Sequence, residues 1–132
     1  MALGDSEVKS RTQTYWGTSM DLPAPIKVGH YTIVFKMLGP DYVHDEEDAT
    51  KDAWGFFDPK DWVIMLDPGL EERPVLLAEV IIHEVQHAIN EVYGVSEDNH
   101  TEEKMVTQGA RGWTQVLIDN PHLMEFVKMK LH

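Results

Sequence analysis

The stretch PVLLAEVIIHEVQHAINEVYG, residues 74–94, decides the fold predicted for this sequence. Pro74 suits the first turn of a helix and Gly94 suits its end, so residues 74–93 are predicted to form one long helix. Polar residues recur along it at steps of three and four and form one narrow stripe, while most other positions are apolar. The stripe comprises Glu79, His83, Gln86, His87 and Asn90. The helix is therefore expected to be largely buried, with one polar face.

Residues 83–87 of this helix read His-Glu-Val-Gln-His, an HExxH pattern. Four residues of helix turn through about 400°, so His83 and His87 lie about 40° apart on one face and about 6 Å apart along the axis. Their imidazoles can converge on one Zn²⁺ ion, and Glu84 beside them can act as a general base. The alternative, that both histidines are ordinary core or surface residues, is disfavoured by their position on an otherwise apolar helix.

A catalytic zinc site needs a third protein ligand. The chain has no Cys, so that ligand must be His, Asp or Glu, and Tyr93 stands where the metzincin pattern requires its third histidine. A second helix is predicted over residues 101–119. At about 100° per residue, the mean direction of its apolar residues lies about 20° from Glu102 and about 80° from Glu103. Glu102 is therefore the expected ligand, with Glu103 and His100 as alternatives.

The first half of the chain carries the strand signals. Residues 1–25 are polar and end in two prolines, so they are expected to form a loosely packed arm before a single domain, residues 26–132. Residues 26–37 are rich in β-branched and aromatic side chains and predict a strand centred on Ile33. Residues 54–66 predict a β-hairpin whose turn contains a proline.

Three further segments complete the predicted order of elements. Residues 41–53 concentrate acidic side chains and are expected to form an exposed loop. The apolar face of the second helix is predicted to include Met105, Val106, Ala110, Trp113, Val116 and Leu117. After it, Asn120 is the predicted cap of a short third helix that begins at Pro121.

Composition limits the classes of partner. The 132 residues include 23 Asp and Glu against 11 Lys and Arg, a formal charge of −12, so the field of the protein repels nucleic acid. The longest apolar run falls far short of the roughly 20 residues that span a bilayer, so no membrane partner is expected. The N-terminus lacks the basic start and apolar stretch of a signal peptide, which predicts a cytoplasmic location.

The predicted hairpin, the HExxH helix and a second helix opening with Thr101-Glu102-Glu103 resemble the small gluzincin-type zinc metallopeptidases. The sequence is most similar to compact phage and prophage proteins distantly related to the ImmA/IrrE group, over about residues 54–131. This resemblance implies an α+β, minimal zincin-like fold, in which a small, mainly antiparallel sheet packs on the HExxH helix with the glutamate helix behind. The residue that would stabilise the oxyanion stays open between Tyr93, His100 and Arg111.

Two functions from different classes follow from these residues. The first is a zinc-dependent peptidase, in which His83, His87 and Glu102 hold Zn²⁺ and Glu84 is the general base. Its peptide or protein substrate would add to the sheet edge provided by residues 54–66. The second is a metal-stabilised binding or structural module, in which the ion ties two helices together and Glu84 is dispensable. The sequence leaves the oligomeric state open.

Overall fold

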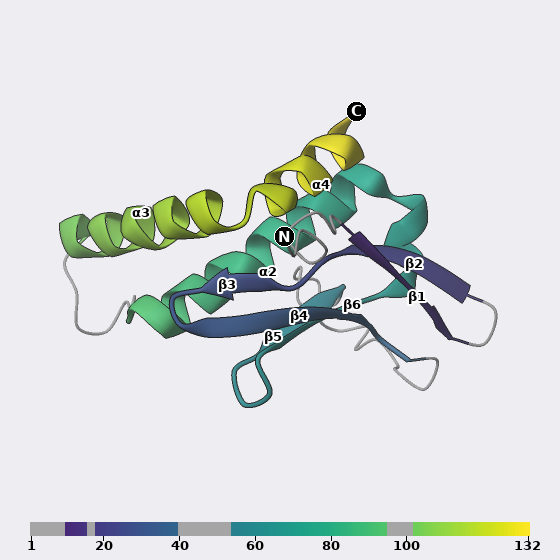
Figure 1. Ribbon diagram of the computed structural model, residues 1–132, viewed down its shortest axis with the longest axis horizontal. Helices are drawn as coiled ribbons and strands as arrows, with labels where there is room; N and C mark the ends of the chain where they lie inside the picture. The colour runs from purple at the N-terminus through teal and green to yellow at the C-terminus, as the bar shows by residue number, and fades with distance from the viewer. Residues whose placement is uncertain (1–9, 16–17, 40–53, 95–101) are drawn as a thin grey trace, which may run out of the picture.

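The computed structural model describes residues 10–15, 18–39, 54–94 and 102–132, and these form an α+β fold. Helix α2 lies between the larger sheet on one side and helices α3 and α4 on the other (Figure 1). The α+β class predicted from the sequence is confirmed. The core fills the space between these layers and contains mostly aliphatic side chains from the sheet and from α2.

The strands form two small sheets. Strands β1 (Ser10–Tyr15) and β2 (Thr18–Pro23) pair antiparallel, and the larger sheet contains β3 (Ile26–Val28), β4 (Tyr31–Met37), β6 (Val63–Leu66) and β5 (Gly55–Asp58), in that spatial order. The pairs β3–β4 and β5–β6 are antiparallel, whereas the central pair β4–β6 is parallel. The larger sheet is therefore mixed: most of its pairings are antiparallel, as expected, and the pair β4–β6 is the exception.

The predicted hairpin and first helix are confirmed. The turn between β5 and β6 is closed by the Lys60 amide, which donates to Asp58 Oδ1 at 2.9 Å. A short 3₁₀ helix, η2 (Pro68–Glu72), leads into α2 (Pro74–Tyr93). Gly94 ends α2 in the left-handed conformation with φ of 66°, as a helix-terminating glycine should.

Two further helices follow, α3 (Glu102–Asp119) and α4 (Pro121–Leu131). None of the helices in the described ranges is long and apolar enough to cross a membrane. The acidic segment predicted as an exposed loop, residues 41–53, lies outside the described residues.

The segment before residue 25 is packed more closely than the sequence predicts. Met20 and Leu22 on β2 are buried, as is Ala24, and all three contribute to the interior. Alternation along the middle of β2 explains this, because Met20 and Leu22 point to the core while Ser19 and Asp21 are more exposed. Residues 18–25 thus form part of the folded unit rather than a loose arm.

The β3 edge of the sheet is covered by amide side chains from the α3–α4 junction. Asn120 accepts the Lys27 amide at 2.7 Å and donates to the Lys27 carbonyl at 2.8 Å. Gln115 accepts the Gly29 amide at 2.8 Å. Asn120 is the N-cap residue of α4, as predicted, but its side chain makes no capping hydrogen bond, because its carboxamide bonds the strand instead. These amides satisfy groups that an uncovered edge would leave open.

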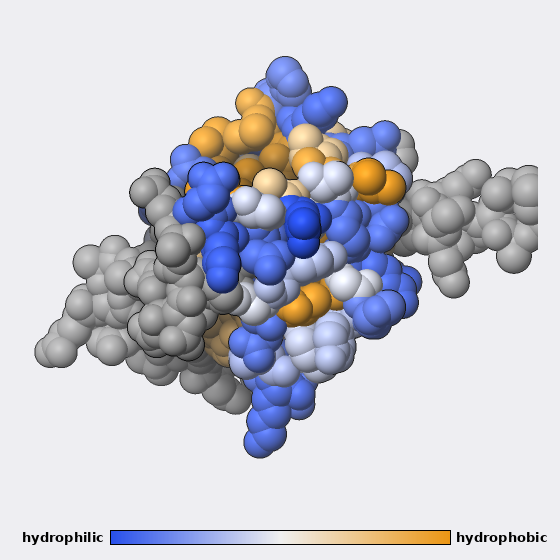
Figure 2. All heavy atoms as spheres, turned by 90° about the vertical axis from the view of Figure 1, so that its left-hand side faces the viewer, coloured by the Kyte–Doolittle hydropathy of each residue, from blue (hydrophilic) through white to orange (hydrophobic). Residues whose placement is uncertain are grey.

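Helix α3 packs on α2 through its C-terminal half. Gly112 lies against α2 so closely that an added Cβ would be 2.4 Å from Ile89 Cγ2. The N-terminal half is different, since Val106 is 63% exposed. The predicted apolar face of this helix is therefore wrong at Val106, Ala110 and Leu117, which are exposed, and correct at Val116. Figure 2 shows apolar surface gathered toward the top of the view, on the side where α3 and α4 lie.

Two glycines on α3 give a matched test of this packing. Gly109→Ala should raise the free energy of unfolding by about 0.5–1 kcal/mol, because alanine favours helix and its Cβ meets nothing within 4 Å. Gly112→Ala should lower it by about 1–2 kcal/mol, because the added methyl overpacks the contact with Ile89. Urea denaturation measures both. Equal effects of the two substitutions would contradict the packing of α3.

Candidate metal centre

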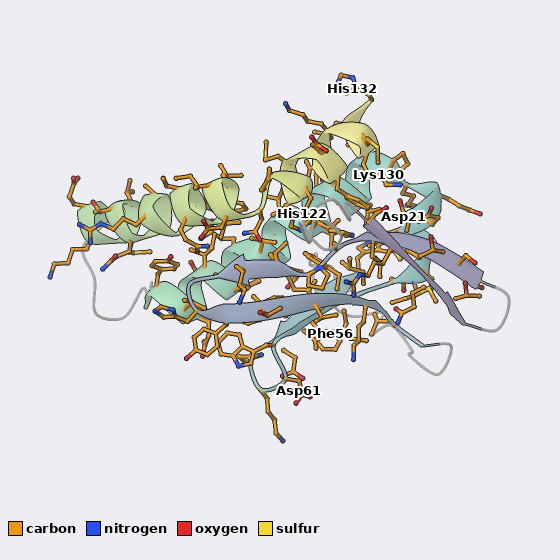
Figure 3. The ribbon with its side chains drawn as sticks, in the orientation of Figure 1. Asp21, Phe56, Asp61, His122, Lys130 and His132 are labelled. Atoms are coloured by element: carbon orange, nitrogen blue, oxygen red, sulfur yellow. The ribbon has the colours of Figure 1, made fainter. Side chains whose placement is uncertain are left out.

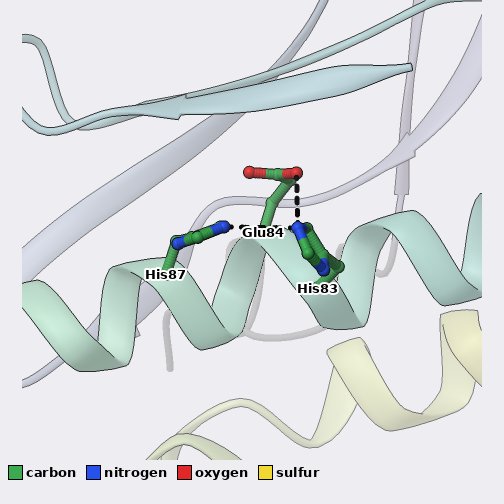
Figure 4. A network of polar contacts seen from close by, with 3 residues as sticks. All are labelled: His83, Glu84 and His87. Carbon is green, nitrogen blue, oxygen red and sulfur yellow. Dashed lines mark hydrogen bonds and ion pairs between the residues drawn. The ribbon is translucent and has the colours of Figure 1, made fainter. Parts of the chain in front are cut away.

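Helix α2 directs the three residues of the HExxH pattern to two different sides. Glu84 points toward the sheet and is 1% exposed, whereas His83 is half-buried and His87 is exposed (Figure 4). This follows from helix geometry, since Glu84 lies about 100° round the axis from His83. The sequence placed the two histidines on one polar face and Glu84 at its edge. In the structure the histidines lie on the polar stripe and the glutamate lies in the adjoining wall.

The two imidazoles converge. His83 Nε2 and His87 Nε2 are 3.2 Å apart, and the rings meet edge to face with centroids 4.8 Å apart. Two nitrogens bound to one tetrahedral Zn²⁺ at about 2.0–2.1 Å would lie about 3.3 Å apart. The same separation also suits a hydrogen bond between neutral imidazoles, one donating and one accepting. The separation of the two nitrogens is therefore compatible with two adjacent positions of a tetrahedral zinc ion.

The carboxylate of Glu84 lies near the two imidazoles but not at a ligand's distance from their nitrogens. Its Oε2 is 3.9 Å from His83 Nε2. A buried carboxylate is costly in a low-dielectric setting, and a divalent cation held by the adjacent histidines would offset part of that cost. Glu84 thus lies next to the histidine pair with both carboxylate oxygens buried.

A pocket of about 440 Å³ opens beside these residues. It lies between α2 and the β5 end of the hairpin, and Figure 3 shows Phe56 on this strand with Asp61 at the hairpin turn. Its lining consists of Phe56, Phe57, Pro59, Glu84, His87, Asn90 and Glu91. The pocket combines apolar side chains from the hairpin with polar and charged side chains from α2.

The structure does not bring Glu102 to the histidine pair. Glu102 precedes Gly112 by ten residues, or about 15 Å of helix, and α3 runs antiparallel to α2. Its backbone is therefore carried past the C-terminal end of α2, away from His87. Glu103 shares this placement and has an exposed side chain, while His100 lies outside the described residues. Within the described ranges, no group of three His, Asp or Glu side chains is arranged to hold a metal ion.

The backbone position of Glu102 beyond the end of α2 has a physical cause. The expectation assumed that the whole apolar face of α3 packs on the core, but only its C-terminal half does. Gly112 has no side chain and so allows α3 to approach α2 closely at this point. The positions of the apolar residues along α3 do not reveal where this close approach occurs. Tyr93, considered for the oxyanion, instead donates to Gln115 Oε1 at 2.9 Å.

Sequence reasoning also missed a polar chain next to the histidines. Trp113 Nε1 on α3 donates to Gln86 Oε1 at 2.6 Å, and Gln86 Nε2 donates to Asn90 Oδ1 at 2.8 Å. The i, i+4 spacing of Gln86 and Asn90 was visible in the sequence, but the indole from α3 was not. Asn90 and Glu91 both line the pocket and were assigned no role.

No protein-family model matches this chain, and no curated protein or solved structure gives a significant match. The resemblance to small gluzincin-type peptidases therefore rests on the quoted motifs alone.

Metal content of single variants tests which residues hold an ion. We expect about one equivalent of zinc per wild-type chain, and its loss in His83→Ala and in His87→Ala, because each removes one of two convergent nitrogens. Glu102→Ala and Glu103→Ala should keep the metal, since α3 carries both backbones away from the pair. Inductively coupled plasma mass spectrometry gives the stoichiometry. Zinc lost with Glu102 would contradict the placement of α3.

Proposed function

We propose that this protein is a zinc-dependent peptidase in which His83 and His87 supply two of the protein ligands to the metal and Glu84 is the general base. The observation that carries the proposal is the 3.2 Å approach of the two Nε2 atoms beside a buried carboxylate and a ligand-sized pocket. When bound, Zn²⁺ supplies Lewis-acid activation of water and of the peptide carbonyl.

The roles of the chain's own residues follow from their positions. His83 and His87 act through Nε2, and both imidazoles must be neutral to do so. Glu84 accepts the proton of the attacking water on its carboxylate and returns it to the leaving amine. Its Oε2 is 3.9 Å from His83 Nε2, and Glu84 is among the residues that line the pocket. Glu102, the third ligand expected from the sequence, finds no support in the position of α3.

The β5 edge supports a peptide as the substrate. Within the described residues β5 ends the larger sheet, whereas β3 at the other end is bonded by Asn120 and Gln115. An extended chain can add to such an edge through main-chain hydrogen bonds. Phe56 and Phe57 on β5 line the same pocket as Glu84, so a peptide on this edge passes the base. The charge of −12 favours basic or neutral peptides.

The alternative of a closed, non-catalytic metal site receives less support. It requires four protein ligands and an ion that ties α2 to α3. Trp113 and Gly112 already join these helices, and the acidic start of α3 lies beyond the end of α2. A structural ion would also give no reason for a base beside an open pocket.

Glu84→Gln tests the peptidase directly. The substitution keeps the size of the side chain but removes its ability to take a proton, so cleavage of a peptide library should fall by about 10²-fold to 10⁴-fold. The zinc content should stay at the wild-type level. Rates of cleavage are followed by mass spectrometry of the products.

Glu72→Gln is the matched control, because it makes the same change of charge at an exposed position on η2. It should cleave at the wild-type rate. If Glu84→Gln cleaves as fast as Glu72→Gln, or if the metal-loaded wild type cleaves no peptide, the proposed function is wrong.

A further inference from the structure

The polar chain from α3 to the pocket has only one possible direction. The indole N–H of Trp113 can donate but cannot accept, so the atom of Gln86 that faces it must be the oxygen. The 2.6 Å contact between Trp113 Nε1 and Gln86 Oε1 agrees with this. The amide nitrogen of Gln86 must then face Asn90, and it donates to Asn90 Oδ1 at 2.8 Å. One donor-only group thus fixes the orientation of two carboxamides.

The fixed orientation determines which atom of the Asn90 side chain is available to a ligand in the pocket. The oxygen of Asn90 accepts a hydrogen bond from Gln86. The other polar group of its side chain is the amide NH₂ at Nδ2, which has two N–H donors. Asn90 is half-buried and lines the pocket together with His87 and Glu84. It follows His87 by three residues and therefore lies on the same face of α2.

We propose that the amide NH₂ of Asn90 donates a hydrogen bond to an uncharged main-chain carbonyl oxygen of the substrate. Trp113 and Gln86 are positioning residues that hold this donor in place. This inference rests on the proposed peptidase function and adds the group that orients the peptide. A donor held by a packed network binds better than a rotating one because less orientational freedom is lost on binding.

The charge of the pocket favours a neutral carbonyl over a free carboxylate. Glu84 and Glu91 line it, and no Lys or Arg is among its described lining residues. A terminal carboxylate bound at Asn90 would face both acidic groups, and like charges at short range are unfavourable. The site should therefore prefer a segment within a peptide to its C-terminal residue.

An ordinary role for the same contacts is stabilisation of the helix. Gln and Asn side chains at i, i+4 stabilise a helix by a few tenths of a kcal/mol without any ligand. Such a role predicts that removing Asn90 changes stability and leaves peptide binding alone. The two interpretations differ in binding, which is measurable without turnover.

The test uses the zinc-loaded Glu84→Gln protein and a pool of N-acetylated, C-amidated hexapeptides, whose tightest binder is titrated by calorimetry. Asn90→Ala and Asn90→Asp, each combined with Glu84→Gln, should weaken the dissociation constant by about 5-fold to 10-fold, the loss of one hydrogen bond. Trp113→Phe should weaken it by about 2-fold to 5-fold, because Gln86 and Asn90 are then free to turn. The free-acid form of a peptide cut back to end at the bound carbonyl should bind more weakly than its amide.

Gln108→Ala is the control, since it removes a carboxamide from α3 that does not line the pocket. It should bind like the parent. A second readout needs no substitution at Asn90: its side-chain NH₂ resonances should shift in the ¹H–¹⁵N spectrum when the peptide is added to the Glu84→Gln protein.

The outcomes separate this inference from the proposed function. If wild type cleaves the peptide while Asn90→Ala binds as the parent does and the NH₂ resonances stay in place, the role of Asn90 is overturned and the peptidase stands. If Asn90→Ala weakens binding but wild type cleaves nothing, the peptidase is overturned and the role of Asn90 stands. If Trp113→Phe has no effect on binding, the positioning role is wrong. Absence of binding by every peptide overturns both.

Discussion

The packing of helix α2 between the sheet and helices α3 and α4 is the constraint on which the rest depends. With two sides of the helix covered, its residues have fixed directions: Glu84 is held in the wall facing the sheet, and His83 and His87 remain on the open stripe. The convergence of the imidazoles follows from their spacing on this rigid element. A mobile loop with the same residues would have to order them at an entropic cost.

Side-chain amides perform two tasks in this fold. Asn120 and Gln115 bond the backbone of β3 and so close one edge of the sheet, which leaves β5 as the other end among the described strands. Gln86 and Asn90 carry a hydrogen-bond direction from Trp113 to the pocket. In both cases a residue on or next to α3 makes the contact: Asn120 and Gln115 bond the backbone at the β3 edge, and Trp113 bonds Gln86 on α2. Among the described residues, helix α3 reaches the polar side chains next to the pocket through the indole of Trp113, which donates to Gln86.

The sequence predicted those features that depend on local periodicity. Helix α2, its glycine end, the β5–β6 hairpin and the convergence of His83 and His87 all follow from spacing within one element. The sequence did not predict the contacts between elements that are distant in the chain. The burial of Met20, the use of Asn120 against β3 and the close approach at Gly112 depend on distant partners, and no local pattern reports them. The choice of Glu102 as a ligand rested on an apolar face of α3 that is only partly packed.

The central claim is that two imidazoles of α2 hold one zinc ion, and X-ray absorption at the zinc edge of the metal-loaded wild-type protein tests it most directly. The account predicts two histidine nitrogens at about 2.0–2.1 Å, with the multiple-scattering signal of imidazole rings. His83→Ala should remove one of them. A spectrum with no imidazole, or with a single imidazole that survives in both His83→Ala and His87→Ala, would contradict the account.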